Sequence, residues 1–159
     1  MRSFVYNTEQ FLPITIDTAW DFFSSANNLA LITPPELDFK ILTNLDGKEI
    51  TEGMLINYRV KPLLNIPLNW KTEIVKIEKP GMFTDRQLKG PYKMWEHTHY
   101  FIQKDNGVLM KDKVKYQLPF GIIGQVAHSM FVRKKIEHIF IYRKEILNKI
   151  FKDHGTNNY

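Results

Sequence analysis

The chain has 159 residues, of which 43% are hydrophobic and 25% are charged, and its formal net charge is +5. A chain of this length buries a sizeable core as one unit, so we expect a single domain over residues 1–159, with a disordered tail at about 153–159. The sequence contains no cysteine, which excludes disulfides, thiolate catalysis and cysteine-based zinc sites.

The distribution of charged and apolar residues gives no sign of binding to nucleic acid or of insertion into a membrane. The lysines are scattered, which favours a solvated surface over attraction to nucleic acid or anionic lipid. The N-terminus lacks the apolar core of a signal peptide, and no apolar run approaches the length of a membrane-spanning helix. We therefore expect a cytoplasmic protein that neither binds nucleic acid nor integrates into a membrane. Its oligomeric state is open, and a homodimer is compatible with the sequence.

The first part of the chain predicts one strand followed by two short helices. Residues 3–12 are rich in Phe, Val and Tyr, which favours a strand. Asp17 or Thr18 can cap a first helix, and a second helix is expected around residues 27–32. The proline pair at 34–35 should end it, because a residue before proline avoids helical geometry.

Antiparallel strands are expected in the middle of the chain. Two of them are predicted over residues 37–42 and 54–61. A further strand runs through Trp70 and Ile74, and its apolar face changes after Ile74, which predicts a β-bulge. Residues 109–118 alternate lysines with mostly apolar residues, so one face of that strand meets water and the other points inward.

A long amphipathic helix is predicted from about Gln125 to Lys152, because apolar residues recur there at every third or fourth position. The predicted fold class is therefore α+β. A strongly curved antiparallel sheet needs cover for its concave face, and one long helix can provide it. The space between sheet and helix is then either filled by side chains or open for a ligand.

The segment from Phe83 to Phe101 is the most informative part of the sequence. It predicts two strands joined by a turn at residues 89–91. Because side chains alternate along a strand, one face combines aromatic rings with groups that donate, accept or titrate, which is typical of a lined pocket. That face carries Phe83, Asp85, Gln87, Trp95, His97, His99 and Phe101.

Asp112 lies on the inward face of its strand, opposite a row of lysines. An unpaired buried carboxylate is unfavourable, so this group must be paired, hydrogen-bonded or protonated. His97 or His99 on the preceding strand faces the same way. Two interpretations stay open: a structural bond to histidine or backbone, and a group that orients a ligand or acts in acid–base chemistry.

His97 and His99 also resemble half of a metal site. A His-x-His pair on a strand can bind zinc or iron when a carboxylate and a third nitrogen join it, and Asp85 or Asp112 could supply the carboxylate. The other three histidines lie on or beyond the C-terminal helix. We therefore expect no metal and no other cofactor, and interpret both histidines as cavity-lining donors.

The other polar candidates have structural alternatives. Asp85 and Gln87 either contact a ligand or satisfy the neighbouring turn and strand. Arg143 lies on the inner stripe of the helix, and we expect it to snorkel to the edge rather than to reach an interior carboxylate or an anionic ligand. Four aromatic residues either fill the core or wall a cavity: Tyr58, Trp70, Trp95 and Tyr116.

Two loops at the ends of the sheet are unusually apolar. Their large side chains either fold back over the core or form an apolar rim, which is a candidate portal for a ligand or a contact for a partner. The candidate portal residues are Leu63, Leu64, Ile66 and Phe120.

Several segments together resemble one known superfamily. They are residues 13–23, residues 29–35, the Phe83–Phe101 pattern with Gly90-Pro91 and His97-x-His99, residues 112–121 and residues 139–143. Through them the chain resembles, over about residues 2–152, the ligand-binding branch of the START-like (SRPBCC) superfamily, which includes the birch-pollen allergen and polyketide cyclase/dehydrase families. The resemblance implies a helix-grip fold, in which a curved seven-stranded antiparallel sheet wraps around a long C-terminal helix, with two short helices after the first strand.

The resemblance also implies a central cavity for lipids, sterols, polyketides or similar molecules, and it leaves three hypotheses. The first is binding or carriage of an apolar small molecule in that cavity. The second is a cyclase- or dehydratase-like enzyme in which a histidine acts as base and Asp112 orients it, although no catalytic signature assigns a reaction. The third is a protein or membrane interaction module that uses the apolar rim.

Overall fold

The computed structural model describes residues 2–45, 47–62, 66–119, 126 and 131–152. Seven strands, three α-helices and one 3₁₀ turn are assigned within these ranges. In chain order they are β1 (Phe4–Leu12), α1 (Ile16–Phe23), α2 (Ala26–Leu29), the 3₁₀ turn η1 (Pro35–Leu37), β2 (Lys40–Ile41), β3 (Leu55–Val60), β4 (Leu68–Glu78), β5 (Met82–Lys89), β6 (Met94–Lys104), β7 (Gly107–Gln117) and α4 (Arg133–Lys152).

The strands form one antiparallel sheet in the order β1-β7-β6-β5-β4-β3-β2. The first and last strands pair along the whole of β1, from Phe4 opposite Tyr116 to Leu12 opposite Val108. Consecutive strands from β2 to β7 are neighbours, as hairpin connections favour. Strands β1 and β2 lie at opposite edges, so α1, α2 and η1 carry the chain across one face of the sheet.

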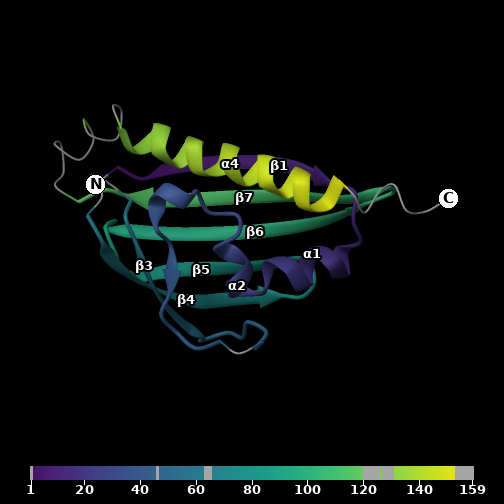
Figure 1. Ribbon diagram of the computed structural model, residues 1–159, viewed down its shortest axis with the longest axis horizontal. Coiled ribbons are helices and arrows are strands. Elements are labelled where there is room, and N and C mark those ends of the chain that lie inside the picture. Colours follow the sequence, from purple (N-terminus) through teal and green to yellow (C-terminus); the bar gives the residue numbers. More distant parts are fainter. Residues whose placement is uncertain (1, 46, 63–65, 120–125, 127–130, 153–159) are drawn as a thin grey trace.

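The long helix α4 covers the same face, running along β1 and β7 beside the two short helices (Figure 1). Side chains from both layers meet in one apolar cluster, which includes Trp20 of α1 and Leu147 of α4. Trp20 packs edge-on against Phe83 and Phe101 of the sheet, with ring centroids 5.9 and 6.2 Å apart. The predicted α+β class with a helix-covered sheet is confirmed.

The first helix begins earlier than the sequence suggested. Its N-cap is Thr15, whose Oγ1 accepts a hydrogen bond from the backbone N–H of Thr18 at 3.1 Å. The prediction of Asp17 or Thr18 as cap was wrong, because Thr15 also has a capping oxygen and precedes the first apolar residue of the helix. Asp17 instead lies in the first turn, where a negative charge favours the helix dipole.

The second strand is much shorter than predicted. Residues 37–42 were expected to be extended, but only Lys40 and Ile41 pair with β3. Pro35 starts a 3₁₀ turn that ends at Leu37, and Asp38 adopts a left-handed conformation with φ of 44°. Because of these two features, the chain joins the sheet only at Lys40.

Other details of the strands follow the prediction. The register between β4 and β5 shifts between Ile74 and Lys76, which confirms the predicted β-bulge. The inward face of β7 buries Asp112 and Val114 while Lys113 and Lys115 are exposed. The predicted start of the C-terminal helix at 125 and the tail at 153–159 lie outside the described residues, and the helix extends through Lys152, the last described residue. Within the described ranges, no helix is long and apolar enough to cross a membrane.

Candidate functional site

A cavity lies between the sheet and the helices that cover it. Its volume is about 170 Å³, counted as space for the centres of water-sized spheres. Most of its wall is apolar, and one end is polar. The apolar wall includes Phe22, Leu29, Ile56, Tyr58, Trp70, Ile74, Trp95 and Ile139, and the polar end is formed by Asp85, His97, His99 and Arg143.

A second cavity of about 140 Å³ adjoins the first on the side of the N-terminal half of α4 and the turn between β5 and β6. Pro62, Tyr92, Leu118 and Phe140 line only this second space. The side chains that line both cavities are Leu37, Val60, Trp70, Trp95, His97, Ile139 and Arg143. These shared side chains separate the two spaces, and His97 and Arg143 of the polar end are among them.

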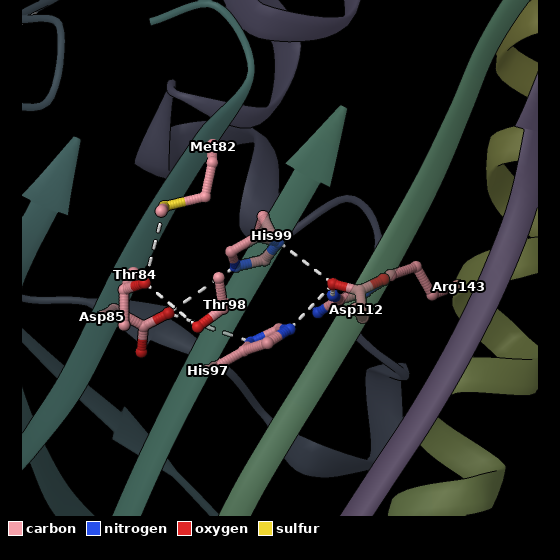
Figure 2. A network of polar contacts seen from close by, with 8 residues as sticks. All are labelled: Met82, Thr84, Asp85, His97, Thr98, His99, Asp112 and Arg143. Atoms are coloured by element: carbon pink, nitrogen blue, oxygen red, sulfur yellow. Dashed lines mark hydrogen bonds and ion pairs between the residues drawn. The ribbon is translucent and has the colours of Figure 1, made fainter. Parts of the chain in front are cut away.

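The register of three strands brings the polar groups together. His97 and His99 are two residues apart on β6, so both imidazoles point to the concave face. Asp85 of β5 lies opposite His97, and Asp112 of β7 lies opposite His99. Because β6 runs between β5 and β7, the two rings lie between two carboxylates, and Arg143 of α4 approaches from the side of Asp112 (Figure 2).

The two carboxylates contact the rings at different distances. Nε2 of His97 lies 2.7 Å from Oδ1 of Asp112 in a buried hydrogen bond, and Nδ1 of His99 lies 3.0 Å from the same oxygen. Oδ2 of Asp85 lies 3.8 Å from Nδ1 of His97 and 3.6 Å from Nε2 of His99. The distances to Asp85 are too long for hydrogen bonds. Each ring therefore directs one nitrogen to Asp112 and the other toward Asp85.

Burial and charge act in opposite directions on these groups. Burial alone would raise the pKa of Asp112, but the hydrogen bond from His97 and the close approach of the His99 ring outweigh it and hold that pKa well below its usual range. Burial lowers the pKa of His97, and the neighbouring His99 lowers it further, against the effect of Asp112. For His99 burial is outweighed by Asp112 and Asp85, and the pKa is raised.

Arg143 does not snorkel, so that prediction was wrong. It is only 6% exposed, and its guanidinium lies 4.8 Å over the ring of Phe140. Its Nη1 lies 3.7 Å from Oδ1 of Asp112, and its Nε and Nη1 have no hydrogen-bond partner. Burial lowers its pKa and the charge of Asp112 raises it, with a net lowering. The charge of Asp112 across the interface therefore offsets only part of the cost of burying this arginine.

Gln87 belongs to the turn rather than to the cavity wall. Its side-chain amide donates to the carbonyl of Tyr92 at 2.7 Å, and its Oε1 accepts from the N–H of Tyr92 at 3.4 Å. A Cβ atom at Gly90 would overlap this carboxamide, which explains the glycine. Of the two interpretations left open for Asp85 and Gln87, the turn applies to Gln87 and the cavity to Asp85.

Three other predicted site residues are buried away from both cavities. Phe101 packs in the core against Trp20 and Phe23. Tyr116 packs against Trp95 with ring centroids 5.9 Å apart. Asp112 lies behind the imidazoles and reaches the cavity only through them. Tyr58, Trp70, Asp85, Trp95, His97, His99 and Arg143 do line the first cavity.

The predicted portal is only partly described. Leu63, Leu64 and Phe120 lie outside the described residues. Ile66 is 54% exposed and lines neither cavity. The interaction module therefore stays a prediction from the sequence.

Sequence reasoning missed the contribution of the two short helices and of the turn after β5. Phe22 and Leu29 close the first cavity, and Tyr92 walls the second. Burial raises the pKa of the Tyr92 phenol well above its usual range. A contact between α1 or α2 and the sheet joins residues far apart in the chain, and no local pattern reveals it. Ile139 was recognisable, because it lies on the inner stripe of the long helix.

Comparisons with known proteins are informative at the level of structure. No family model matches the sequence, and no curated protein sequence matches it. The two-domain ARO/CYC protein StfQ from the steffimycin biosynthetic pathway is similar with a TM-score of 0.72 at 8% identity, over 96% of this chain and 51% of that one. The chain thus spans about half the length of StfQ.

Two single-domain structures are similar over nearly their whole length. A protein of Chromobacterium violaceum gives a TM-score of 0.70 at 8% identity, over 92% of this chain and 96% of that one. Norcoclaurine synthase of Thalictrum flavum, in complex with dopamine and hydroxybenzaldehyde, gives 0.64 at 12% identity, over 93% of this chain and 88% of that one. The chain therefore shares the helix-grip fold of these structures, and identities this low show the fold alone.

Proposed function

We propose that this protein binds or carries an apolar small molecule in the cavity between the sheet and α4. The observation that supports this function is an interior space whose wall is largely apolar and aromatic, with the carboxylate, imidazole and guanidinium groups of its lining clustered together. Small-molecule sites have this composition, because apolar walls provide binding energy and a few polar groups fix orientation.

The wall suggests the shape of the ligand. Tyr58, Trp70 and Trp95 offer flat faces, and the ring of Tyr58 is stacked on that of Trp70 with centroids 5.8 Å apart. Flat or ring-containing molecules make the largest contact with such faces. The similar norcoclaurine synthase structure is a complex with two small aromatic molecules, dopamine and hydroxybenzaldehyde, which supports a ligand of this class. A lipid or polyketide with at least one polar group fits the same description.

The test is a binding titration with the neutral apolar dye N-phenyl-1-naphthylamine, whose fluorescence rises in an apolar site. Ile56→Trp and, independently, Ile139→Trp place a larger side chain in the cavity. We expect each to weaken dye binding by about tenfold or more, which corresponds to about 1.4 kcal/mol. Ile102→Trp, on the exposed face of β6, is the matched control and should bind the dye as the wild type does. Equal dye binding by all four proteins would contradict the proposal.

A second candidate is an enzyme of the cyclase or dehydratase type that acts in the same cavity. The observation that favours it is His97, which lines the cavity and is held by a hydrogen bond to buried Asp112. His97 would then lie at the reacting end of the ligand. Asp112→Asn should leave dye binding intact and abolish turnover of a cyclisable poly-β-keto thioester. Wild-type protein without such turnover would leave binding or carriage as the function.

A further inference from the structure

We propose that Asp85, His97 and His99 form a binding site for a divalent transition metal ion of the zinc or iron(II) type at the polar end of the cavity. From the sequence alone no metal was expected, because no third nitrogen could be assigned to join the His-x-His pair and a carboxylate from Asp85 or Asp112. The fold brings Asp85 to that pair from the adjacent strand. One ligand atom from each of the three residues lies within 4.8 Å of the other two.

The distances between these atoms suit ligands of one ion better than hydrogen-bond partners. Oδ2 of Asp85 lies 3.8 Å from Nδ1 of His97 and 3.6 Å from Nε2 of His99. Zinc binds such atoms at about 2.0–2.1 Å, and two ligands of a tetrahedral ion are then roughly 3.4 Å apart. Small rotations of the three side chains would therefore bring them to an ion placed between them.

The outer contacts of both rings have the arrangement found around bound metals. The nitrogen that points away from Asp85 in each ring lies close to Oδ1 of Asp112, at 2.7 Å for His97 and 3.0 Å for His99. Metal-binding histidines commonly donate their second N–H to a carboxylate, which fixes the tautomer and the ring orientation. Nε2 of His97 makes this hydrogen bond to Asp112, whereas Nδ1 of His99 lies near the same oxygen without hydrogen-bond geometry. A small rotation of the His99 ring would complete the second bond, and with both protons on the side of Asp112 the lone pairs of both rings face Asp85.

The balance of charges in the cluster is compatible with a cation beside Asp85. Arg143 lies 3.7 Å from Asp112 and provides that carboxylate with a counter-charge. Among the described residues, the two imidazoles are the only basic groups within ion-pair distance of Asp85. A divalent ion with neutral histidines would give the cluster one net positive charge, which an anionic or strongly polar ligand oxygen could balance. The alternative without metal is a single imidazolium between the carboxylates.

The position of the site connects the ion to the cavity. All three proposed ligands line the first cavity, whereas Asp112 lies behind the rings. Three protein ligands leave at least one coordination position for water or for an oxygen of a bound molecule. This inference does not require the proposed function, because metal binding can be measured without any organic ligand.

The test is a titration of chelator-treated, dialysed protein with zinc sulfate, followed by calorimetry, and with cobalt sulfate, followed by its visible absorption spectrum. We expect one ion per chain with a dissociation constant of about 1 μM or below. Asp85→Asn and His99→Ala should each weaken binding by about 100-fold or more, and Asp112→Asn by about 10- to 100-fold through the lost outer contact. His138→Ala, which removes an exposed histidine paired with Glu36, is the control and should bind zinc as the wild type does.

Three outcomes would overturn the metal site: no stoichiometric binding by the wild type, equal binding by wild type and Asp85→Asn, or loss of binding in His138→Ala alone. Near-ultraviolet circular dichroism and dye binding establish that each variant is folded. Asp85→Asn keeps the size of the side chain, so we expect it to fold, and it provides the test of the site if His99→Ala does not fold. Wild type that binds the dye but no metal overturns only this inference. Wild type that binds the metal but not the dye overturns only the proposed function.

Discussion

Asp112 on β7 and Arg143 on α4 are both buried, and Nη1 of Arg143 lies 3.7 Å from Oδ1 of Asp112. The same carboxylate oxygen accepts the hydrogen bond from His97. One oxygen therefore connects the sheet, the polar end of the cavity and the covering helix. A buried charged group is stabilised by its partner of opposite charge. A substitution at either residue should therefore lower the free energy of unfolding.

Replacing Asp112 by Asn should lower the free energy of unfolding by about 3 kcal/mol, because Arg143 and the histidines lose the charge that offsets their burial. Urea denaturation followed by circular dichroism measures this change. Glu36→Gln is the matched control, since Glu36 pairs with exposed His138 at 2.7 Å and should contribute less than about 1 kcal/mol. Equal urea midpoints for wild type and Asp112→Asn would show that the buried contact does not stabilise the fold.

Arg143 and Asp112 should also be energetically coupled. We expect Arg143→Met to lower the free energy of unfolding by about 3 kcal/mol, because it leaves a buried carboxylate with one cation fewer. The double variant Arg143→Met/Asp112→Asn should be more stable than the sum of the two single effects predicts, by about 1–3 kcal/mol. A double-mutant cycle measured by urea denaturation gives this coupling. Strict additivity would mean that the 3.7 Å contact carries no interaction energy.

The turn between β5 and β6 should depend on Gln87 for stability and not for ligand binding. Gln87→Ala removes both bonds to the backbone of Tyr92 and should destabilise the protein by about 1–2 kcal/mol with unchanged dye affinity. Gly90→Ala should be destabilising in the wild type and much less so in the Gln87→Ala background, because the overlapping carboxamide is then absent. Weakened dye binding by Gln87→Ala would contradict this prediction and indicate that Gln87 contributes to ligand binding.

The cap of the first helix offers a local test of the observed boundary. Thr15→Ala should destabilise the protein by about 1 kcal/mol, because the N–H of Thr18 loses its acceptor. Asp17→Asn changes only a charge in the first turn and should have an effect of a few tenths of a kcal/mol. Thermal unfolding of both variants ranks them. A larger loss for Asp17→Asn would favour the boundary that the sequence suggested.

Much of the fold could be predicted because its signals are local. Alternation along residues 109–118 identified the inward face that carries Asp112, and the change of apolar face after Ile74 identified the bulge. The wrong predictions concern segments in which neighbouring residues favour different local structures. Thr15 and Asp17 both have oxygens that can cap, and Pro35 with the left-handed Asp38 shortened a strand whose apolar residues looked suitable.

The candidate site was predictable in its sheet half only. Side-chain alternation placed Asp85, His97 and His99 on one face, and the register brought them together. The depth of Arg143 was not predictable, because it depends on how closely α4 approaches the sheet and on the charge of Asp112 behind the rings. The closing helices depend in the same way on contacts between distant parts of the chain.

The central claim is that the space under α4 holds one apolar molecule. Native mass spectrometry of the wild type equilibrated with N-phenyl-1-naphthylamine, beside Ile56→Trp and Ile102→Trp, tests it most directly. We expect one dye molecule per chain on the wild type and on Ile102→Trp, and at the same dye concentration a much smaller fraction of Ile56→Trp with bound dye. The same adduct on all three proteins, or no adduct on the wild type, would contradict it.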